Sequence, residues 1–448
     1  MKITRLKIIC IGILITFGVY MFTTPTNSRT TIVVESGVNI QPQPSPSRRV
    51  SGFSNKPLNF KKDMETFPWQ EFRSAVQEGR VDETDDFSQM LITKLVPYIL
   101  QSPRTPINDS CTPEPLPTPE HLDCAVYPNV FTGKLRDKPA RIGHMVQIGF
   151  DIDVLEIHLN ELHDMVDDFF IIESTSTHFH KLKKPLMWEH VKLQDRFAKF
   201  SDKVVHFALD DADLTVGNEL FSAEAHQEKR RWQKFVEWNA HKGNLYGDSD
   251  IIGFGDTDEI TRRLNVHLLK HCQLQDNVKK IDIGIWFPYG PINQVFNPYW
   301  HVPGNNYALG DPTFYVVGEA KKEEAPSRNR GQSGHFLLGG MHMTHYGYLP
   351  YQIIKKLSCT ECGIKSMPQL SIFADDLETG NISQLELKLL QPPDDFKNRI
   401  RDISTMDQEF RDRVAILPWF YNCNRNRYPV WESKNDKRLQ VKKSKIIV

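Results

Sequence analysis

Short apolar runs alternate with stretches of helical spacing from about residue 141 onward. Ile152, Leu155, Leu159, Leu162 and Val166 recur every three or four residues, which predicts an amphipathic helix over 152–166. Further helices are expected over 189–200, 222–241 and 261–271, and strands over 142–148, 169–172, 204–209, 251–254 and 281–287. Strands separated by helices of this length predict an α/β fold with a mostly parallel sheet covered on both faces.

Outside this region the pattern is weaker. A helix is expected over 84–100, and the prolines of 102–120 end it. Residues 288–312 are rich in Pro, Gly and Asn and predict a loop. Short strands over 314–317 and 335–338 and a helix over 385–390 complete the prediction.

The N-terminus has the pattern of a membrane segment. Lys2, Arg5 and Lys7 precede an uncharged run whose apolar part covers 8–22. A span needs roughly 20 apolar residues, and the preceding cations favour a cytoplasmic N-terminus. We therefore expect a cytoplasmic tail over 1–7 and a transmembrane signal-anchor over 8–24. The competing interpretation is a cleaved signal peptide, and either one sends the rest of the chain into the secretory lumen.

The remaining boundaries follow from composition. Residues 25–60 include the Pro-rich stretch QPQPSPS and predict a flexible stem. Beyond it we expect a luminal N-terminal extension over 61–140, the α/β domain over 141–430 and a basic C-terminal tail over 431–448.

Charge and cysteine content narrow the function. The 448 residues carry 55 Lys and Arg and 56 Asp and Glu, so the basic excess of a nucleic-acid-binding protein is missing. Six of the seven cysteines follow the apolar segment, which suits luminal disulfides with 15 possible pairings. The sequence Cys359-Thr360-Glu361-Cys362 lacks a second such motif to complete a zinc site, which favours a structural disulfide. Asn108 and Asn381 begin N-glycosylation sequons.

Four Asp-x-Asp pairs are candidates for cation binding. The pairs begin at Asp151, Asp211, Asp248 and Asp256, and each has the ordinary alternative of a turn or a helix N-cap. Asp256 and Asp258 stand out because they follow a buried strand, where ligands bind in such sheets. Two neighbouring carboxylates suit Mn²⁺ or Mg²⁺, which would neutralise the diphosphate that leaves a nucleotide sugar.

Several motifs resemble glycosyltransferase family 17, whose type member is a β-1,4-mannosyl-glycoprotein 4-β-N-acetylglucosaminyltransferase. The motifs are DIDVLEIHLNEL at 151–162, VDDFFIIES at 166–174, Thr177-His178, 184–186, Arg196-Phe197, Arg231-Trp232-Gln233, Asn239 and DTDEI at 256–260. The resemblance covers about 145–350. Thr257 and Thr261 depart mildly from the family pattern, whereas GMHMTHY at 340–346 only loosely matches it, which bears on acceptor recognition.

The resemblance implies a nucleotide-diphospho-sugar transferase (GT-A-like) fold and an inverting, metal-dependent transfer. N-acetylglucosamine would pass from UDP-N-acetylglucosamine to a mannose of a glycoprotein N-glycan, in the Golgi membrane, by a single-pass type II protein. Asp256, Asp258 and His342 are the expected metal ligands. The expected nucleotide-sugar contacts are Glu173, Arg231, Gln233 and Arg262.

An inverting transfer also needs a general base. The sequence offers Asp311, Glu319 and Asp375 without deciding among them. Three alternatives stay open: a Golgi glycan-binding protein without activity, a glycoside hydrolase built on two carboxyl groups, and a transferase with another donor or acceptor.

Overall fold

A computed structural model describes residues 58–101, 106–108, 110–178, 182–210, 222–296, 308–323, 325–328, 333–344, 346–347, 349–358, 376, 378 and 398–428. All of them belong to one compact unit, residues 52–448. The predicted membrane segment, residues 25–57 of the predicted stem, the helix over 385–390 and the basic tail lie outside the described residues. The last stem position, Phe60, is buried and belongs to a helix, so the predicted stem extends too far. Among the helices that are described, none combines the length and the apolar character that crossing a bilayer requires.

An eight-stranded sheet organises the unit. Its spatial order is β4 (Val204–Leu209), β3 (Asp168–Ser174), β2 (Ile142–Gln147), β5 (Ile251–Asp256), β10 (Ala308–Val316), β8 (Lys280–Trp286), β11 (Phe336–His342) and β6 (Glu259–Thr261). The strands predicted over 142–148, 169–172, 204–209, 251–254, 281–287, 314–317 and 335–338 are thereby confirmed.

The sheet is mixed. Strands β2, β3, β4 and β5 pair in parallel, and so do β8 and β11. Strand β10 lies antiparallel between β5 and β8, and β6 is antiparallel to β11. The α/β class is confirmed, but the prediction of a mostly parallel sheet missed these two reversed strands. The sequence predicts a loop and no helix over 288–312. A parallel neighbour would need a crossover connection, usually a helix, so a chain without that helix can enter the sheet in the antiparallel direction.

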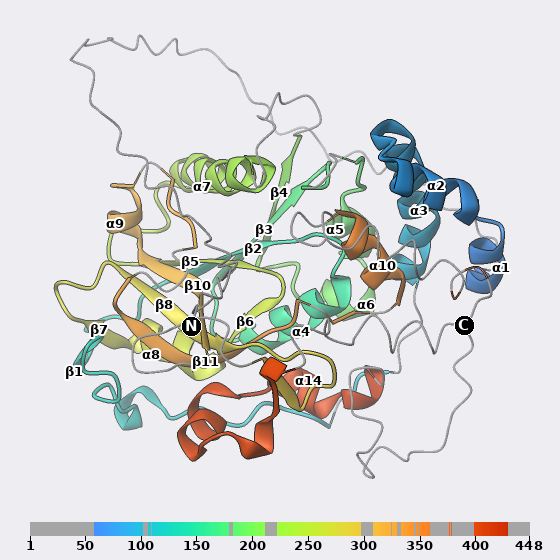
Figure 1. Ribbon diagram of the computed structural model, residues 1–448. Helices are drawn as coiled ribbons and strands as arrows, with labels where there is room; N and C mark the ends of the chain where they lie inside the picture. The colour runs from blue at the N-terminus through green and yellow to red at the C-terminus, as the bar shows by residue number, and fades with distance from the viewer. Residues whose placement is uncertain are drawn as a thin grey trace, which may run out of the picture. The chain divides into compact units, whose positions relative to one another are not determined.

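Helices cover both faces of the sheet (Figure 1). Helix α7 (Ser222–His241) packs Trp232 and Phe235 against Met145, Phe170 and Phe254. The neighbouring positions Ile142, Phe169 and Ile251 belong to the larger cluster that contains α4 (Ile152–Leu162) and α8 (Arg263–His271). Because successive strand residues point to opposite faces, each strand contributes to two cores.

Helix α4 is confirmed, but its polar side does not face solvent. Every residue from Ile152 to Leu162 is buried. Glu156 accepts hydrogen bonds from Arg427 Nη2 (2.5 Å) and the Tyr428 hydroxyl (3.1 Å). The backbone N–H of Trp419 donates to Glu161 (2.7 Å). A segment more than 250 residues away in the sequence therefore covers the polar side of this helix.

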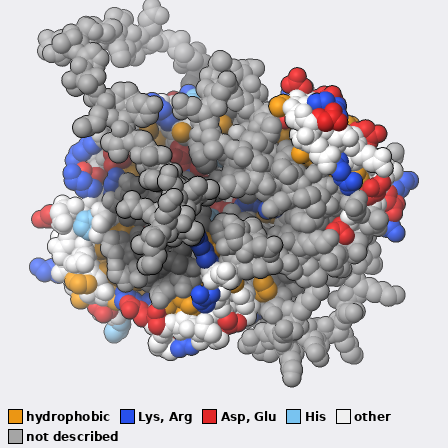
Figure 2. Space-filling model, in the orientation of Figure 1, with side chains coloured by type: hydrophobic (Ala, Val, Ile, Leu, Met, Phe, Trp, Pro, Cys, Tyr) orange, Lys and Arg blue, Asp and Glu red, His pale blue; other side chains and the backbone are white. Residues whose placement is uncertain are grey.

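The other helices match their predictions in part. Helix α3 (Val81–Gln101) and α7 are confirmed, whereas the single helix expected over 189–200 is two short ones, α5 (Met187–Val191) and α6 (Asp195–Ala198). The N-terminal helices α1 (Phe60–Glu65) and α2 (Trp69–Glu78) join α3, which packs against α10 (Leu349–Ser358). Figure 2 shows acidic and basic side chains interspersed over these N-terminal helices, as the balanced charge leads one to expect.

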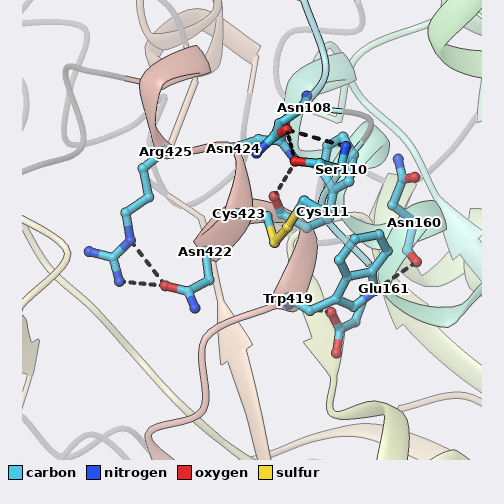
Figure 3. Close-up of a disulfide and its surroundings, with 11 residues drawn as sticks. Asn108, Ser110, Cys111, Asn160, Glu161, Trp419, Asn422, Cys423, Asn424 and Arg425 are labelled. Carbon is cyan, nitrogen blue, oxygen red and sulfur yellow. Dashed lines mark hydrogen bonds between the residues drawn. A yellow bond between two sulfur atoms is a disulfide. The ribbon is translucent and has the colours of Figure 1, made fainter. Parts of the chain in front are cut away.

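Small elements and disulfides surround the sheet. Two small sheets have two strands each: β1 (Phe131–Leu135) pairs with β7 (Cys272–Leu274), and β9 (Gln294–Phe296) pairs with β12 (Ile400–Asp402). Two short helices are α9 (Val317–Ala320) and α14 (Trp419–Cys423). Disulfides join Cys124 to Cys272 and Cys111 to Cys423 (Figure 3). Cys359 and Cys362 lie outside the described residues.

Candidate active site

A cavity opens at the carboxyl ends of β2, β3 and β5. Its lining combines acidic, basic and amide side chains with a few hydroxyls. Asp256 and Asp258 line it, and His342, at the end of β11, lines it as well. In the antiparallel register of β6 and β11, His342 lies opposite Glu259, which explains how residues 83 positions apart meet. The structure therefore brings together the three residues predicted as metal ligands.

Backbone and side-chain hydrogen bonds fix the turn that carries the two aspartates. Thr257 donates through its N–H (3.0 Å) and its hydroxyl (2.8 Å) to the Gln147 carbonyl at the end of β2. The Asp256 N–H donates to Glu259 Oε2 (2.9 Å). Thr257 is buried, so Asp256 and Asp258 are directed to the other side of the turn. The threonine that departs from the family pattern thus has a structural role.

Two buried histidines lie beneath this turn. His158 Nδ1 is 2.9 Å from the Thr257 carbonyl, and because a carbonyl oxygen only accepts, the imidazole donates there. His158 Nε2 is 3.0 Å from His144 Nε2, which supplies the proton of that second hydrogen bond. Burial lowers the pKa of His158 to about 4 and that of His144 well below its usual value, so both rings are neutral.

Arg328 binds the acidic side of the turn. Its Nη1 donates to Asp256 Oδ2 (2.6 Å) and to Glu259 Oε1 (2.9 Å). Its other nitrogens donate to Glu224 (2.6 Å) and Glu228 (3.0 Å) on α7. The arginine side chain is 5% exposed, whereas Asp256 is 32% exposed toward the cavity. One guanidinium therefore neutralises part of a cluster of four carboxylates.

Asp258 has different cationic neighbours. Lys355 Nζ of α10 lies 3.3 Å from Asp258 Oδ2, and His342 Nε2 lies 3.6 Å from Asp258 Oδ1. Burial alone would raise the pKa of Asp258, but Lys355 and His342 hold it well below the usual range. Burial would likewise lower the pKa of His342, yet the Asp258 carboxylate raises it. Asp258 is therefore an anion that lies beside Lys355 and His342.

Two further carboxyl groups at the site have raised pKa values. Burial, assisted by the charge of Asp258, raises the pKa of Asp151 to about 7. Burial raises the pKa of Glu259 to about 7 despite the opposing charge of Arg328. The cavity thus contains carboxyl groups of contrasting basicity, a pattern that is enriched at functional sites.

The donor atoms fit a divalent cation, although the present geometry does not assemble a coordination shell. Carboxylate oxygens and an imidazole suit Mn²⁺ or Mg²⁺. Asp256 Oδ1 and His342 Nδ1 are buried without a hydrogen-bond partner among the residues that the structure describes. Within those same residues, no three His, Cys, Asp or Glu side chains converge closely enough to hold a metal. Arg328 and Lys355 lie against the two carboxylates instead.

The four predicted nucleotide contacts are not among the residues that line the cavity. Glu173 is fully buried on β3, where Lys184 Nζ (2.5 Å) and the Trp188 N–H (3.1 Å) bind its carboxylate. Burial alone would raise the pKa of Glu173, but Lys184 and the hydrogen bonds lower it. Glu173 therefore anchors the segment after β3, and Lys184 extends from this anchor to the cavity wall.

Of the three others, two lie on α7 and one precedes α8. Arg231 is fully buried on α7, with its guanidinium 5.2 Å from the Phe254 ring and 3.3 Å from Glu228. Gln233 is half-buried on the same helix, and Arg262 precedes α8. The matching residue types were visible in the sequence, but the side of the helix that each would occupy was not.

Several cavity residues were not among the expected metal ligands or nucleotide contacts. Asp151, Gln147, Gln227, His178, Arg328 and Lys355 line the cavity. Gln147 Nε2 donates to Gln227 Oε1 (2.9 Å), and His178 Nε2 lies 2.7 Å from the same oxygen. Asp151 belongs to an Asp-x-Asp pair at the end of a strand, a signal that was available. Arg328 follows Asp256 by 72 positions and has no local signature.

The structure also separates the base candidates. Asp311, within β10, lines the cavity and is 3% exposed. Glu319 lies on α9, where Lys322 (2.6 Å) and Lys279 (3.8 Å) pair with it. Asp375 is outside the described residues. Of the described candidates, Asp311 is therefore the one at the site.

Two solved structures of glucosyl-3-phosphoglycerate synthase from Mycobacterium tuberculosis are similar to this chain. The complex with UDP covers 61% of this chain and 88% of its own, at 12% identity and a TM-score of 0.24. The complex with Mn²⁺, UDP and glucosyl-3-phosphoglycerate covers 64% of this chain and 89% of its own, at 14% identity and a TM-score of 0.24. Superpositions this poor carry no inference about fold or ligand. No curated protein sequence matches the chain.

The family model described as glycosyltransferase family 17 matches residues 115–284. This segment contains β2, α4, β3, α7, β5 and the turn with Asp256 and Asp258, whereas Asp311, Arg328, His342 and Lys355 follow it. The motif resemblance is thereby confirmed over the part of the chain that carries the acidic turn, and residues 115–284 match glycosyltransferase family 17.

Proposed function

We propose that this protein is a metal-dependent, inverting glycosyltransferase that moves N-acetylglucosamine from UDP-N-acetylglucosamine to a mannose of a glycoprotein N-glycan, in β-1,4 linkage. The observation that carries the proposal is the meeting of Asp256, Asp258 and His342 in one cavity, at the end of a strand within the family 17 segment. The donor, the acceptor and the GT-A-like classification rest on the family resemblance.

Asp256, Asp258 and His342 would hold Mn²⁺ or Mg²⁺, and such a cation neutralises charge that builds on the diphosphate as the glycosyl bond breaks. Gln147, Gln227 and His178 provide hydrogen-bonding groups on the cavity wall for the rest of the donor. His158 and Thr257 form hydrogen bonds that restrict the backbone of the acidic turn, which carries the two carboxylates.

Asp311 is the proposed general base. Inverting transfer requires a group that accepts the proton of the acceptor hydroxyl while its oxygen attacks the anomeric carbon from the face opposite the diphosphate. The Asp311 carboxyl group, within β10, lines the same cavity as the acidic turn and is not one of the expected metal ligands. These are the positional requirements of that role.

The cellular setting completes the proposal. The cationic and apolar pattern of the first 24 residues supports a Golgi, type II orientation with the transferase unit in the lumen. The two disulfides suit an oxidising compartment. Asn108 is exposed, as a glycosylated residue must be, and Asn381 lies outside the described residues.

The test is release of UDP by the full-length protein purified from a secretory host. Wild type is expected to hydrolyse UDP-N-acetylglucosamine slowly with Mn²⁺ and not with chelator. The Asp256→Asn, Asp258→Asn double variant should lose at least about a hundredfold in rate, the typical effect of removing transition-state charge stabilisation. Asp248→Asn, at the other end of the same strand, is the matched control and should keep the wild-type rate.

Other outcomes are informative. Turnover of a different nucleotide sugar would keep the reaction class and change the donor. Glycan cleavage without nucleotide or metal would replace the transferase with a hydrolase. A folded wild type that binds glycans but neither UDP nor Mn²⁺ would replace it with a glycan-binding protein.

A further inference from the structure

Arg328 shares one guanidinium among four carboxylates, and this arrangement needs an explanation. Nη1 bridges Asp256 Oδ2 and Glu259 Oε1, while the other nitrogens bind Glu224 and Glu228. These contacts join the acidic turn to α7. Nη1 thus lies between two carboxylate oxygens, which is where a bridging cation would also be most stabilised.

We infer that Arg328 is a donor-binding residue that, before the donor arrives, holds the carboxylates on which the metal depends. In the donor-bound protein its guanidinium binds the diphosphate, and the cation takes its place at Asp256. The inference rests on the proposed function, because a nucleoside diphosphate is the ligand that would receive the arginine.

Charge repulsion explains why the cation and the Arg328 guanidinium cannot occupy Asp256 together. A divalent cation on Asp256 would lie within a few ångströms of a guanidinium on the same carboxylate, and like charges at that separation repel strongly in a partly buried site. Removing the guanidinium from Asp256 without a replacing cation is also unfavourable, because partly buried charges need partners. Arg328 therefore stabilises the turn until another cation replaces it.

The Arg328 guanidinium is also suited to binding the diphosphate of the donor. Its planar N–H groups suit the paired oxygens of a phosphate. Arg328 lines the same cavity as Asp256 and Asp258, so the diphosphate of a bound donor would lie within its reach. Asp256 Oδ1 has no hydrogen-bond partner among the described residues, which leaves it available for the incoming cation.

A purely structural ion pair between the turn and α7 is the competing explanation. It predicts that loss of Arg328 loosens the site and weakens the binding of every ligand. The exchange that we infer predicts that loss of Arg328 strengthens Mn²⁺ binding and weakens UDP binding, because the arginine competes with the metal but assists binding of the nucleotide.

The experiment measures binding of Mn²⁺ alone, and of UDP at saturating Mn²⁺, by titration calorimetry on full-length wild type, Arg328→Gln and Arg328→Lys. Arg328→Gln should bind Mn²⁺ about tenfold more tightly and UDP about tenfold more weakly, the change that one charge-assisted hydrogen bond typically produces. Arg328→Lys keeps the charge and should bind Mn²⁺ as wild type does, while UDP binding is weakened because the planar donor group is lost.

Arg196→Gln is the matched control, since Arg196 is 10% exposed, pairs with buried Asp153 at 3.1 Å and does not line the cavity. It should change neither affinity. Weaker or unchanged Mn²⁺ binding in a folded Arg328→Gln protein would overturn the inference. If Arg328→Gln does not fold, an unchanged UDP affinity in Arg328→Lys would overturn it. Failure of wild type to bind UDP at all would instead refute the proposed function, and the donor-binding role with it.

Discussion

Glu161 shows at the scale of one residue how burial changes an ionisable group. It is 3% exposed on α4, and its carboxyl accepts a hydrogen bond from the Trp419 N–H. Burial raises the pKa of Glu161 to about 8 from an ordinary value of 4.5. The folded protein therefore retains a proton that the unfolded chain releases between those two pH values. Stability from this group is complete below pH 4.5 and is lost as the pH rises toward 8.

Glu161→Gln tests this linkage, because glutamine still accepts the Trp419 hydrogen bond but does not titrate. The free energy of unfolding, measured in urea at pH 5, 6, 7 and 8, should fall more steeply with pH in wild type than in the variant. The difference has an upper limit of about 1.4 kcal/mol per pH unit for one proton. Exposed Glu65→Gln, whose parent pairs with Lys61 on the surface, should leave the slope unchanged. Equal slopes for wild type and Glu161→Gln would contradict the assignment.

At the scale of elements, α4 differs from the amphipathic surface helix that its sequence predicts. Asp153 pairs with Arg196, and Glu156 pairs with Arg427 and the Tyr428 hydroxyl. His158, two positions after Glu156, donates a hydrogen bond to the Thr257 carbonyl of the acidic turn. The helix thus joins the active-site turn to the C-terminal segment through buried polar contacts.

Glu156→Gln should destabilise the fold by about 3–5 kcal/mol, because it removes the carboxylate that pairs with the buried Arg427 guanidinium. Arg427 and Glu156 are 3% and 0% exposed, so solvent cannot compensate. Equilibrium unfolding in urea measures the loss. The surface pair provides the control: Glu409→Gln, which removes the exposed partner of Arg413, should change stability by less than about 0.5 kcal/mol. A similar small effect at Glu156 would mean that the buried pair is energetically neutral.

At the scale of the whole molecule, disulfides connect segments that are remote in the sequence. Cys111 and Cys423 are 312 positions apart, and the Asn108 N–H donates to Asn424 Oδ1 (2.9 Å) beside them (Figure 3). This connection fixes α14, which covers α4. The second disulfide instead attaches Cys124 to the start of β7.

The Cys111→Ala, Cys423→Ala double variant should lose about 2–5 kcal/mol of stability, as is usual when a native disulfide is removed. Limited proteolysis should then cut near 419–428 earlier than in wild type. Cys124→Ala, Cys272→Ala is the comparison, since it should also lower stability but leave that segment protected. Unchanged protection of 419–428 in the first variant would show that packing on α4 alone retains the C-terminal segment.

The sequence predicted the elements well where the signal was local. Strand ends, the periodicity of α7 and α3, and the position of Asp256 and Asp258 after β5 all depend on neighbours within a few residues. It predicted less well where the direction of a strand depends on the path of the chain outside it. The antiparallel insertion of β10 between β5 and β8 is of this kind.

What the sequence determined by itself is the α/β class, the position of the acidic turn and its resemblance to family 17, because hydrophobic period and strand-end motifs are local properties. The tertiary structure alone decided that Arg328 and Lys355 meet those carboxylates, that Glu173 faces inward, and which cysteines pair. These features depend on contacts between residues that are remote along the chain. Such contacts follow from how helices and strands bury their surfaces against one another, and no short stretch of sequence records them.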